Sequence, residues 1–109
     1  MSSVLLSALR ANEILQANAA SNVANMNTSE YKAIRTSISS SMEGSIDVVT
    51  IRSADPAPLD PEGAMQSNVD VPREFVDMMR AKTGFEAALS AISTREEMFD
   101  DLMNILTGG

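Results

Sequence analysis

Four carboxylates near the C-terminus are the residues in this sequence whose type and spacing come closest to the chemistry of a site. Glu96 and Glu97 precede Asp100 and Asp101, so that carboxylates one helical turn apart share a face. Paired carboxylates of this kind can bind Ca²⁺ or exchange protons with a substrate. The group has neither a glycine-containing loop nor a neighbouring nucleophile, so we interpret it as a solvated acidic helix face. We expect no metal and no cofactor.

Histidine and cysteine are both absent from the 109 residues. Their absence excludes a cysteine nucleophile, a histidine base, zinc sites built on either residue, and disulfides, so we do not expect an enzyme. The lack of cysteine leaves the redox compartment open. A formal net charge of -7 offers no basic surface to nucleic acid.

The composition also bears on membranes and on the type of fold. No apolar run approaches the roughly 18–20 residues that cross a bilayer, and the start lacks a basic leader, so we expect neither membrane insertion nor a cleaved signal. Hydrophobic residues make up 44% of the chain but aromatic residues only 4%, and there are eight methionines. Such aliphatic and flexible side chains favour helix–helix seams over a compact globular core.

The first element that the sequence predicts is an N-terminal helix over Ser2–Asn27. This stretch has no proline or glycine, and its apolar residues recur at intervals of three and four. Small residues along the apolar stripe allow another backbone to approach closely. They are Ala8, Ala11, Ala19, Ala20 and Ala24.

Asparagine is unusually frequent in this helix although it is a weak helix former. Asn18, Asn22 and Asn25 share one face. They are interpreted either as a solvated face followed by a helix stop at Asn27, or as buried amides that set the register between neighbouring helices. The residues alone leave both interpretations open.

The middle of the chain predicts a strand with a possible hairpin partner. Alternating Ile46 and Val48, followed by Ile51, indicate a half-buried strand, and Arg35–Ser39 can pair with it. An isolated hairpin is only marginally stable, so it should lean on a helix or a neighbouring subunit. Asp55–Pro61 is predicted to form an exposed loop rich in proline.

A second, longer helix is predicted over Val71–Leu106, opened by Asp70 and Pro72 and closed by the run 107–109. At 1.5 Å per residue it is on the order of 50 Å long, and the first helix on the order of 40 Å, so the shape should be a rod. Gly84 within it allows either a close helix approach or a slight bend beside Phe85. The apolar stripe of this helix contains Phe75, Met78, Phe85, Leu89, Ile92, Phe99, Met103 and Leu106.

The predicted fold is mainly α, with two long antiparallel terminal helices in a coiled-coil-like pair and a short β/loop middle segment. We divide the chain into an N-terminal helix with an asparagine-rich signature (1–32), a strand and loop segment (33–68) and a C-terminal helix (69–109).

Two segments of this sequence resemble a known family. The run SNVANMNTSEYK at residues 21–32 resembles the signature that ends the first helix in the bacterial flagellar axial proteins of the rod and hook. Residues 68–105 are similar to the C-terminal signature of the same proteins. Ser29-Glu30 departs from the family, which usually places proline or a similar residue and then glycine before the tyrosine. The short middle segment is most like that of a short proximal rod protein.

The resemblance implies a structural subunit of the basal-body rod that polymerises through its terminal helices into the axial tube. It further implies export through the flagellar type III apparatus without a cleaved signal, and a place in the periplasmic rod beside other rod and hook proteins and copies of itself. It also favours the interpretation that the asparagines bind neighbouring helices. The alternative is a soluble helical adaptor or export chaperone that binds a partner helix.

The residues expected at the assembly interface come from the asparagine-rich signature and from the second helix. They are Asn22, Asn25, Asn27, Tyr31, Phe75, Met78, Phe85, Leu89, Ile92, Phe99, Leu102 and Leu106.

Overall fold

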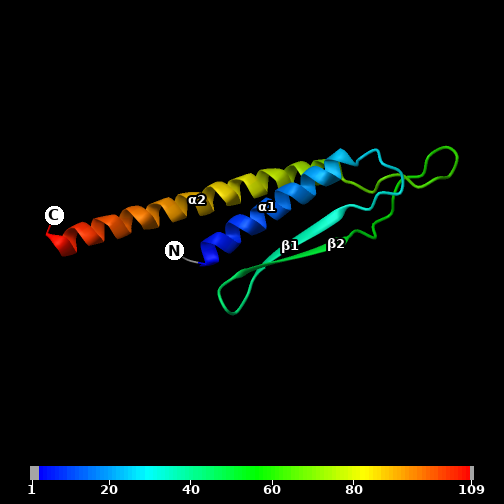
Figure 1. The fold of residues 1–109 in the computed structure, drawn as a ribbon. Coiled ribbons are helices and arrows are strands. Elements are labelled where there is room, and N and C mark those ends of the chain that lie inside the picture. The colour runs from blue at the N-terminus through cyan, green and yellow to red at the C-terminus, as the bar shows by residue number, and fades with distance from the viewer. Residues whose placement is uncertain (1–2, 109) are drawn as a thin grey trace.

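The computed structural model describes residues 3–108 as two antiparallel helices with a β-hairpin alongside (Figure 1). The elements are α1 (Ser3–Ala24), β1 (Ile34–Ser40), β2 (Ile46–Arg52) and α2 (Val71–Thr107). The molecule measures 77 × 24 × 14 Å, and its radius of gyration is 19.7 Å. A compact domain of this length would have a radius near ~13 Å, so the predicted mainly α, rod-shaped fold is confirmed.

The ends of α2 agree with the sequence prediction. Asp70 has extended backbone, and its carboxylate accepts a hydrogen bond from the Arg73 N–H at 3.3 Å. At the other end Gly108 adopts a left-handed conformation with φ of 72°, and its N–H donates to carbonyls of the last turn. Both are standard helix caps. Ser2 and Gly109, also predicted at helix ends, lie outside the described residues.

The end of α1 differs from the prediction, because the helix stops at Ala24 and not at Asn27. The Asn25 amide nitrogen donates to the Ser21 carbonyl at 2.8 Å, and the Thr28 hydroxyl donates to the Asn25 amide oxygen at 2.9 Å. These local side-chain bonds compete with the helical pattern and close the helix early.

The turn after α1 contains Glu30 in the left-handed region, with φ of 60°. The N–H of Glu30 donates to the Met65 carbonyl at 3.1 Å, which fixes the turn against the long loop before α2. Glycine adopts this conformation without strain, whereas other residues do so at a cost. Glu30 therefore takes a glycine-like conformation where the resembling family has glycine.

The predicted hairpin is confirmed, with β1 and β2 antiparallel and Ile38 opposite Val48. Ile46 and Val48 are half-buried, as expected, but Ile51 is 62% exposed. The expectation that Ile51 shares their buried face was wrong, because side chains alternate along a strand and an odd spacing places it on the other side.

The hairpin leans on α1, which satisfies the expectation that it needs a support. The Ile46 N–H donates to the Ser7 hydroxyl at 3.0 Å, and the Asn18 amide donates to the Thr36 hydroxyl at 3.0 Å. The sequence between β2 and α2 forms the exposed loop at the end of the molecule opposite the C-terminus (Figure 1). The Asp60 carboxylate accepts N–H bonds within its tip.

Candidate assembly surface

Small residues form the seam between α1 and α2. Ala11, Leu15 and Ala19, at intervals of four, are buried on α1, and Ala81 and Ala88, one heptad apart, are buried on α2, which packs against α1. This spacing keeps each set on one helix face. The expectation that alanines on the first helix permit close approach of another backbone is confirmed for Ala11 and Ala19, and that backbone belongs to α2 of the same chain. It was wrong for Ala20 and Ala24, which are exposed.

Gly84 lies where α2 approaches the side chain of Asn12 on α1 closely. A Cβ atom placed on it would lie 2.8 Å from the Asn12 Cγ, a distance that real Cβ atoms do not show. The predicted role of Gly84 in close helix approach is therefore confirmed, because a side chain at this position would have to displace the Asn12 side chain of α1.

Polar side chains close the seam near the end of α1. We term them the polar junction, which consists of Asn22, Tyr31, Arg35 and Glu74. Asn22 is fully buried there. Its amide nitrogen donates to the Ile34 carbonyl and to the Glu74 carboxylate, both at 2.9 Å. Its amide oxygen accepts from the Ile34 N–H at 2.8 Å and from the Tyr31 hydroxyl at 3.1 Å. All the hydrogen-bonding capacity of this amide is thus used within the chain.

Glu74 and Arg35 complete the polar junction. The Arg35 guanidinium binds the second Glu74 carboxylate oxygen at 2.8 Å, and the two side chains are 12% and 1% exposed. A buried carboxylate is tolerated because both of its oxygens have partners. The junction therefore ties α1, β1 and α2 together.

The polar junction was only partly predictable from the sequence. Asn22 and Tyr31 were predicted to lie at the assembly interface, whereas Glu74 and Arg35 were not among the predicted site residues. Glu74 lies one heptad before Ala81 on the face that packs against α1. A carboxylate that continues a stripe of small residues is the signal that could have found it.

The other predicted residues of the signature lie nearer the surface. Asn25 is half-buried, and its side chain bonds to the Ser21 carbonyl and the Thr28 hydroxyl within its own segment. Asn27 is exposed. Tyr31 is half-buried, with the Arg52 guanidinium 5.4 Å from its ring centroid. Among these asparagines of the described chain, Asn22 is the one that bonds to another helix.

The predicted stripe of large apolar residues on α2 lies beside the seam and not within it. Met78, Phe85 and Ile92 are half-buried, while Phe75 is 52% exposed and Leu89 is 50% exposed. The close approach of α1 selects the small residues for the contact. The large side chains are therefore displaced to its edge, where a second molecule can reach them.

Part of this stripe lines an open depression between the two helices, which we call the α1–α2 groove. Its volume is about 590 Å³, and its walls include Phe75, Met78, Met79 and Phe85 from α2 and Ala17 from α1. Most of the lining is apolar. The groove is thus a second surface, separate from the seam, on which apolar side chains contact solvent.

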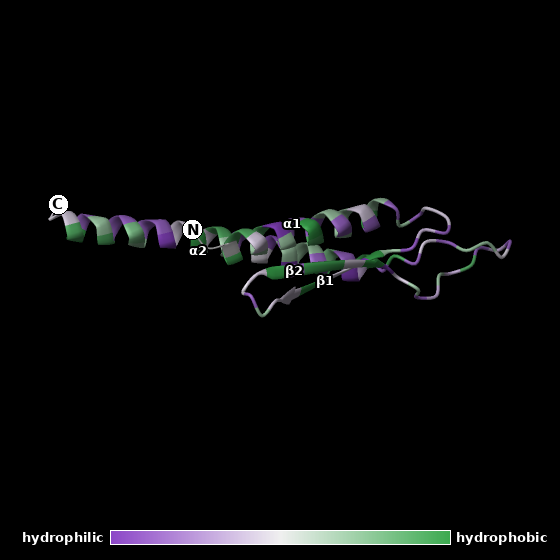
Figure 2. Cartoon of the chain, turned by 60° about the horizontal axis from the view of Figure 1, so that its bottom comes forward, coloured by the Kyte–Doolittle hydropathy of each residue, from purple (hydrophilic) through white to green (hydrophobic). Residues whose placement is uncertain are grey.

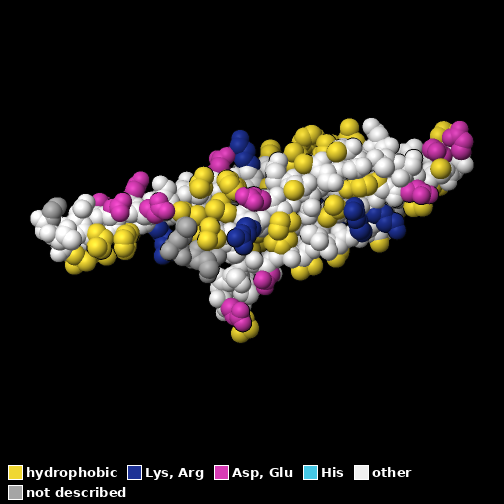
Figure 3. Space-filling view, viewed as in Figure 1, with side chains coloured by type: hydrophobic (Ala, Val, Ile, Leu, Met, Phe, Trp, Pro, Cys, Tyr) yellow, Lys and Arg dark blue, Asp and Glu magenta, His cyan; other side chains and the backbone are white. Residues whose placement is uncertain are grey.

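The C-terminal part of α2 extends past the start of α1 and stands alone in the described structure (Figures 1 and 2). We call residues 94–107 the α2 overhang, and every residue in it is exposed. Figure 3 shows its hydrophobic side chains on the side toward which α1 and the hairpin lie, and its acidic side chains on the opposite side. The large apolar residues of the overhang are Met98, Phe99, Leu102, Met103, Ile105 and Leu106.

The acidic side of the overhang carries the four carboxylates considered at the outset, and all four are exposed. Residues 3–108 hold no cluster of acidic side chains arranged to bind a metal ion. No helix in the described part of the chain is long and apolar enough to span a bilayer.

A comparison with protein families matches residues 62–105 to the flagellar basal body rod FlgEFG protein C-terminal family. This segment is similar to the flagellar rod axial proteins. The match covers nearly all of α2, including the part that lines the groove and most of the overhang. The asparagine-rich signature at residues 21–32 lies outside the matched segment. A comparison with curated proteins found no match.

The match supports a structural role at the flagellar basal body, since the matched family is one of rod components. The resemblance seen in the C-terminal half of the sequence is thereby confirmed.

Proposed function

We propose that this chain is a structural subunit of the basal-body rod that polymerises through its terminal helices into the axial tube. The observation that carries the proposal is the α2 overhang, an exposed helix with an apolar side, within a segment of the rod family. Soluble monomers rarely expose a large continuous apolar patch without using it. Each large side chain that a neighbour covers contributes about 1.5–3 kcal/mol.

The shape of the subunit favours an open series of contacts. The overhang lies at one end of the 77 Å long axis, and the exposed loop with Leu59 and Met65 lies toward the other (Figure 1). A contact between two different surfaces does not close on itself unless the rotation happens to form a ring. Helical growth into a tube follows from such a contact.

In this account the predicted interface residues divide into two groups. Asn22 acts indirectly, because the polar junction holds α2 against α1 and so sets where the groove and the overhang point. Asn25, Asn27 and Tyr31 shape the turn that follows α1. The direct contacts are made by the α2 residues Phe75, Met78, Phe85, Leu89, Ile92, Phe99, Leu102 and Leu106.

The partners in this proposal are copies of the chain and other rod and hook proteins. Export through the flagellar type III apparatus without a cleaved signal, and a final place in the periplasmic part of the rod, follow from the family role. They are part of the proposal and rest on the family match.

A second candidate is a soluble adaptor or export chaperone that binds a partner helix, and the open methionine-containing α1–α2 groove is the observation that favours it. Sedimentation and electron microscopy separate the two. An adaptor should form discrete complexes, whereas a rod subunit should form or join tubes.

The test of the proposal is complementation of a strain that lacks this gene. Ile92→Asp and Phe99→Asp place a carboxylate in the expected contacts, so we expect loss of rods in electron micrographs and loss of motility. Asp47→Lys in the hairpin is the control and should be milder. If the two α2 variants assembled normally while the hairpin variant did not, the interface would lie elsewhere.

A further inference from the structure

The buried carboxylate of Glu74 depends on β1 for the partners of both its oxygens. Its Oε2 atom accepts a hydrogen bond from the Arg35 guanidinium at 2.8 Å. Its Oε1 atom accepts from the Asn22 amide nitrogen at 2.9 Å. That amide is held in turn by the N–H and the carbonyl of Ile34, at 2.8 and 2.9 Å. One oxygen is thus satisfied by β1 directly, and the other by a side chain of α1 that β1 orients.

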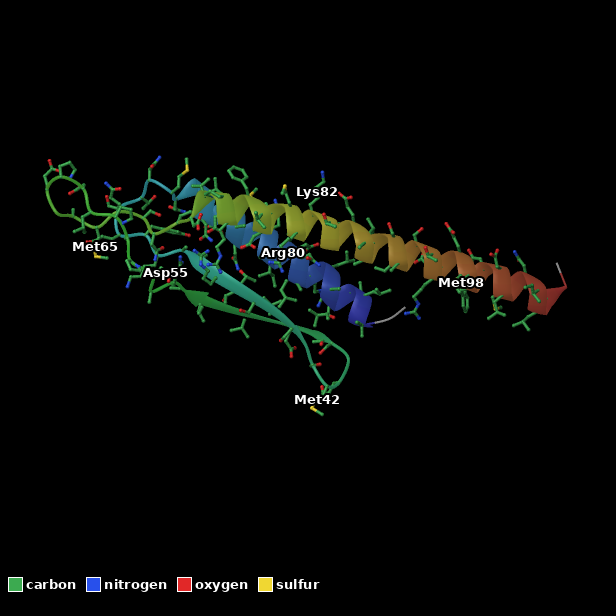
Figure 4. All side chains as sticks on the ribbon, turned by 180° about the vertical axis from the view of Figure 1, so that it is seen from behind. Met42, Asp55, Met65, Arg80, Lys82 and Met98 are labelled. Atoms are coloured by element: carbon green, nitrogen blue, oxygen red, sulfur yellow. The ribbon has the colours of Figure 1, made fainter. Side chains whose placement is uncertain are left out.

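The hairpin reaches the two helices in this way at its base. Figure 4 shows the end of α1, the start of β1 and the start of α2 converging, whereas Met42, in the turn of the hairpin, lies at the other end of the two strands. The strand register places Arg35 opposite Ile51. The position of the Arg35 guanidinium is therefore fixed by the pairing of β1 with β2.

The rest of the seam offers little to offset a carboxylate that has lost these partners. In the described part of the chain, the buried apolar residues of the seam are small apart from one leucine; they are Ala11, Leu15, Ala19, Ala81 and Ala88. Each alanine buries little apolar area. A buried carboxylate without a cation or a donor is strongly unfavourable. Closing the two helices before β1 is in place would therefore cost more than the seam returns.

The ion pair itself has the features of a device for specificity. The Arg35 side chain is 12% exposed, and its Nε atom is buried without a hydrogen-bond partner among residues 3–108. Replacing both members of a buried ion pair by apolar residues of similar volume is often neutral or stabilising, whereas removing one member is strongly destabilising. The pair of Arg35 and Glu74 therefore adds little to the total stability, but it makes each element require the other.

We propose that the polar junction makes the pairing of α1 with α2 conditional on the folded hairpin. Until β1 pairs with β2, the Glu74 carboxylate keeps the two helices apart, and the seam closes when Arg35 and Asn22 reach it. The α1–α2 groove has walls from both helices, so it exists only in a chain whose middle segment has folded. The dependence acts within one chain, so it holds whether or not the chain polymerises.

A distance between the two helices in the full-length chain reports their pairing. The sequence has no natural cysteine, so Glu13→Cys on α1 and Glu86→Cys on α2 carry spin labels at known sites. Both residues are exposed and line the same groove. Pulsed electron paramagnetic resonance on the dilute chain should give one short distance between the labels in this parent.

Val49→Pro is the change that disables the hairpin. The Ser53 N–H donates to the Ala33 carbonyl, and the pair Ser37 and Val49 lies four residues further along each strand, so the Val49 N–H belongs to the same ladder. Proline removes this N–H. The Val49 side chain is 57% exposed, so the change acts on the strand pairing and not on the helices. Val49→Ala keeps the N–H and is the matched control.

We expect Val49→Pro to abolish the short distance in most chains, and Val49→Ala to keep it. In a background with Glu74→Leu and Arg35→Met, the carboxylate is gone, so Val49→Pro should leave the helices paired. Glu74→Gln is a second background, which removes the charge with little change of shape, and it should likewise reduce the loss caused by Val49→Pro.

Three results would overturn the proposal. Helices that stay paired in Val49→Pro would show that pairing does not need the hairpin. An equal loss of the short distance with and without the Glu74 charge would show that the hairpin acts through other contacts. A parent without the short distance would show that the junction does not close in the single chain.

Discussion

Replacement of Asn22 by alanine is expected to unfold the subunit, because this amide is the centre of the polar junction. The Glu74 carboxylate oxygen would lose a hydrogen bond in a site where its side chain is 1% exposed, at a cost of about 1.5–3 kcal/mol. The N–H and carbonyl of Ile34 would each lose a partner, at about 1 kcal/mol apiece. Alanine returns only a few tenths of a kcal/mol of helix propensity.

The sum is a loss of about 3–5 kcal/mol, which is large for a protein of usual stability. This loss is an even larger share of the total stability here, because the other buried side chains of the seam are mostly alanine and contribute little. We expect Asn22→Ala to have lost its helical circular dichroism at urea concentrations where the parent is folded. An isolated N-terminal peptide with the same change should become more helical, since there only propensity acts.

Asn27→Ala is the matched control, since Asn27 is exposed and sits outside the junction. Its free energy of unfolding, measured in urea, should stay within about 0.5 kcal/mol of that of the parent. If Asn22→Ala and Asn27→Ala had the same midpoint, the polar junction would not stabilise the fold and the reasoning from burial would be refuted.

Three further outcomes follow from the structure. Gly84→Ala should destabilise the helix pair despite the better helix propensity of alanine. Adding Asn12→Ala to the same chain should restore the stability. Equal melting temperatures of Gly84→Ala and the parent would contradict the close contact. Glu30→Gly should raise the free energy of unfolding by about 0.5–1 kcal/mol in urea melts, because it relieves a left-handed backbone, and a lower midpoint would show that φ of 60° carries no strain. The overhang should be cleaved first by protease in the dilute chain and become protected as concentration rises, so protection that is independent of concentration would argue against a neighbour covering it.

Local signals in the sequence were sufficient to predict the ends of α2 and the hairpin. Asp70 and Gly108 act at short range through backbone geometry, and the alternation around Ile46 and Val48 depends only on the pleat of a strand. The early end of α1 was missed for the opposite reason. The bonds of the Asn25 side chain within its own segment compete with the helix, and their outcome depends on a small difference in free energy.

The facing of α2 was harder to predict because the helix carries two candidate faces. Large residues such as Phe85 and Leu89 mark one face, and a rule based on hydrophobicity turns them toward the partner helix. The alanines of α1 approach so closely that Ala81 and Ala88 fill the seam instead. The pairing of Glu74 with Arg35 joins residues far apart in the sequence, so no periodicity in either segment could indicate it.

The central claim is that a neighbouring subunit covers the α2 overhang in the assembled rod, and thiol labelling of Leu102→Cys in purified basal bodies tests it most directly. Leu102 is 51% exposed in the single chain, so the dissociated subunit should label readily. We expect the assembled rod to protect Leu102→Cys strongly relative to its own dissociated form, while Val49→Cys changes less. Labelling of Leu102→Cys at the same rate before and after dissociation would contradict the account.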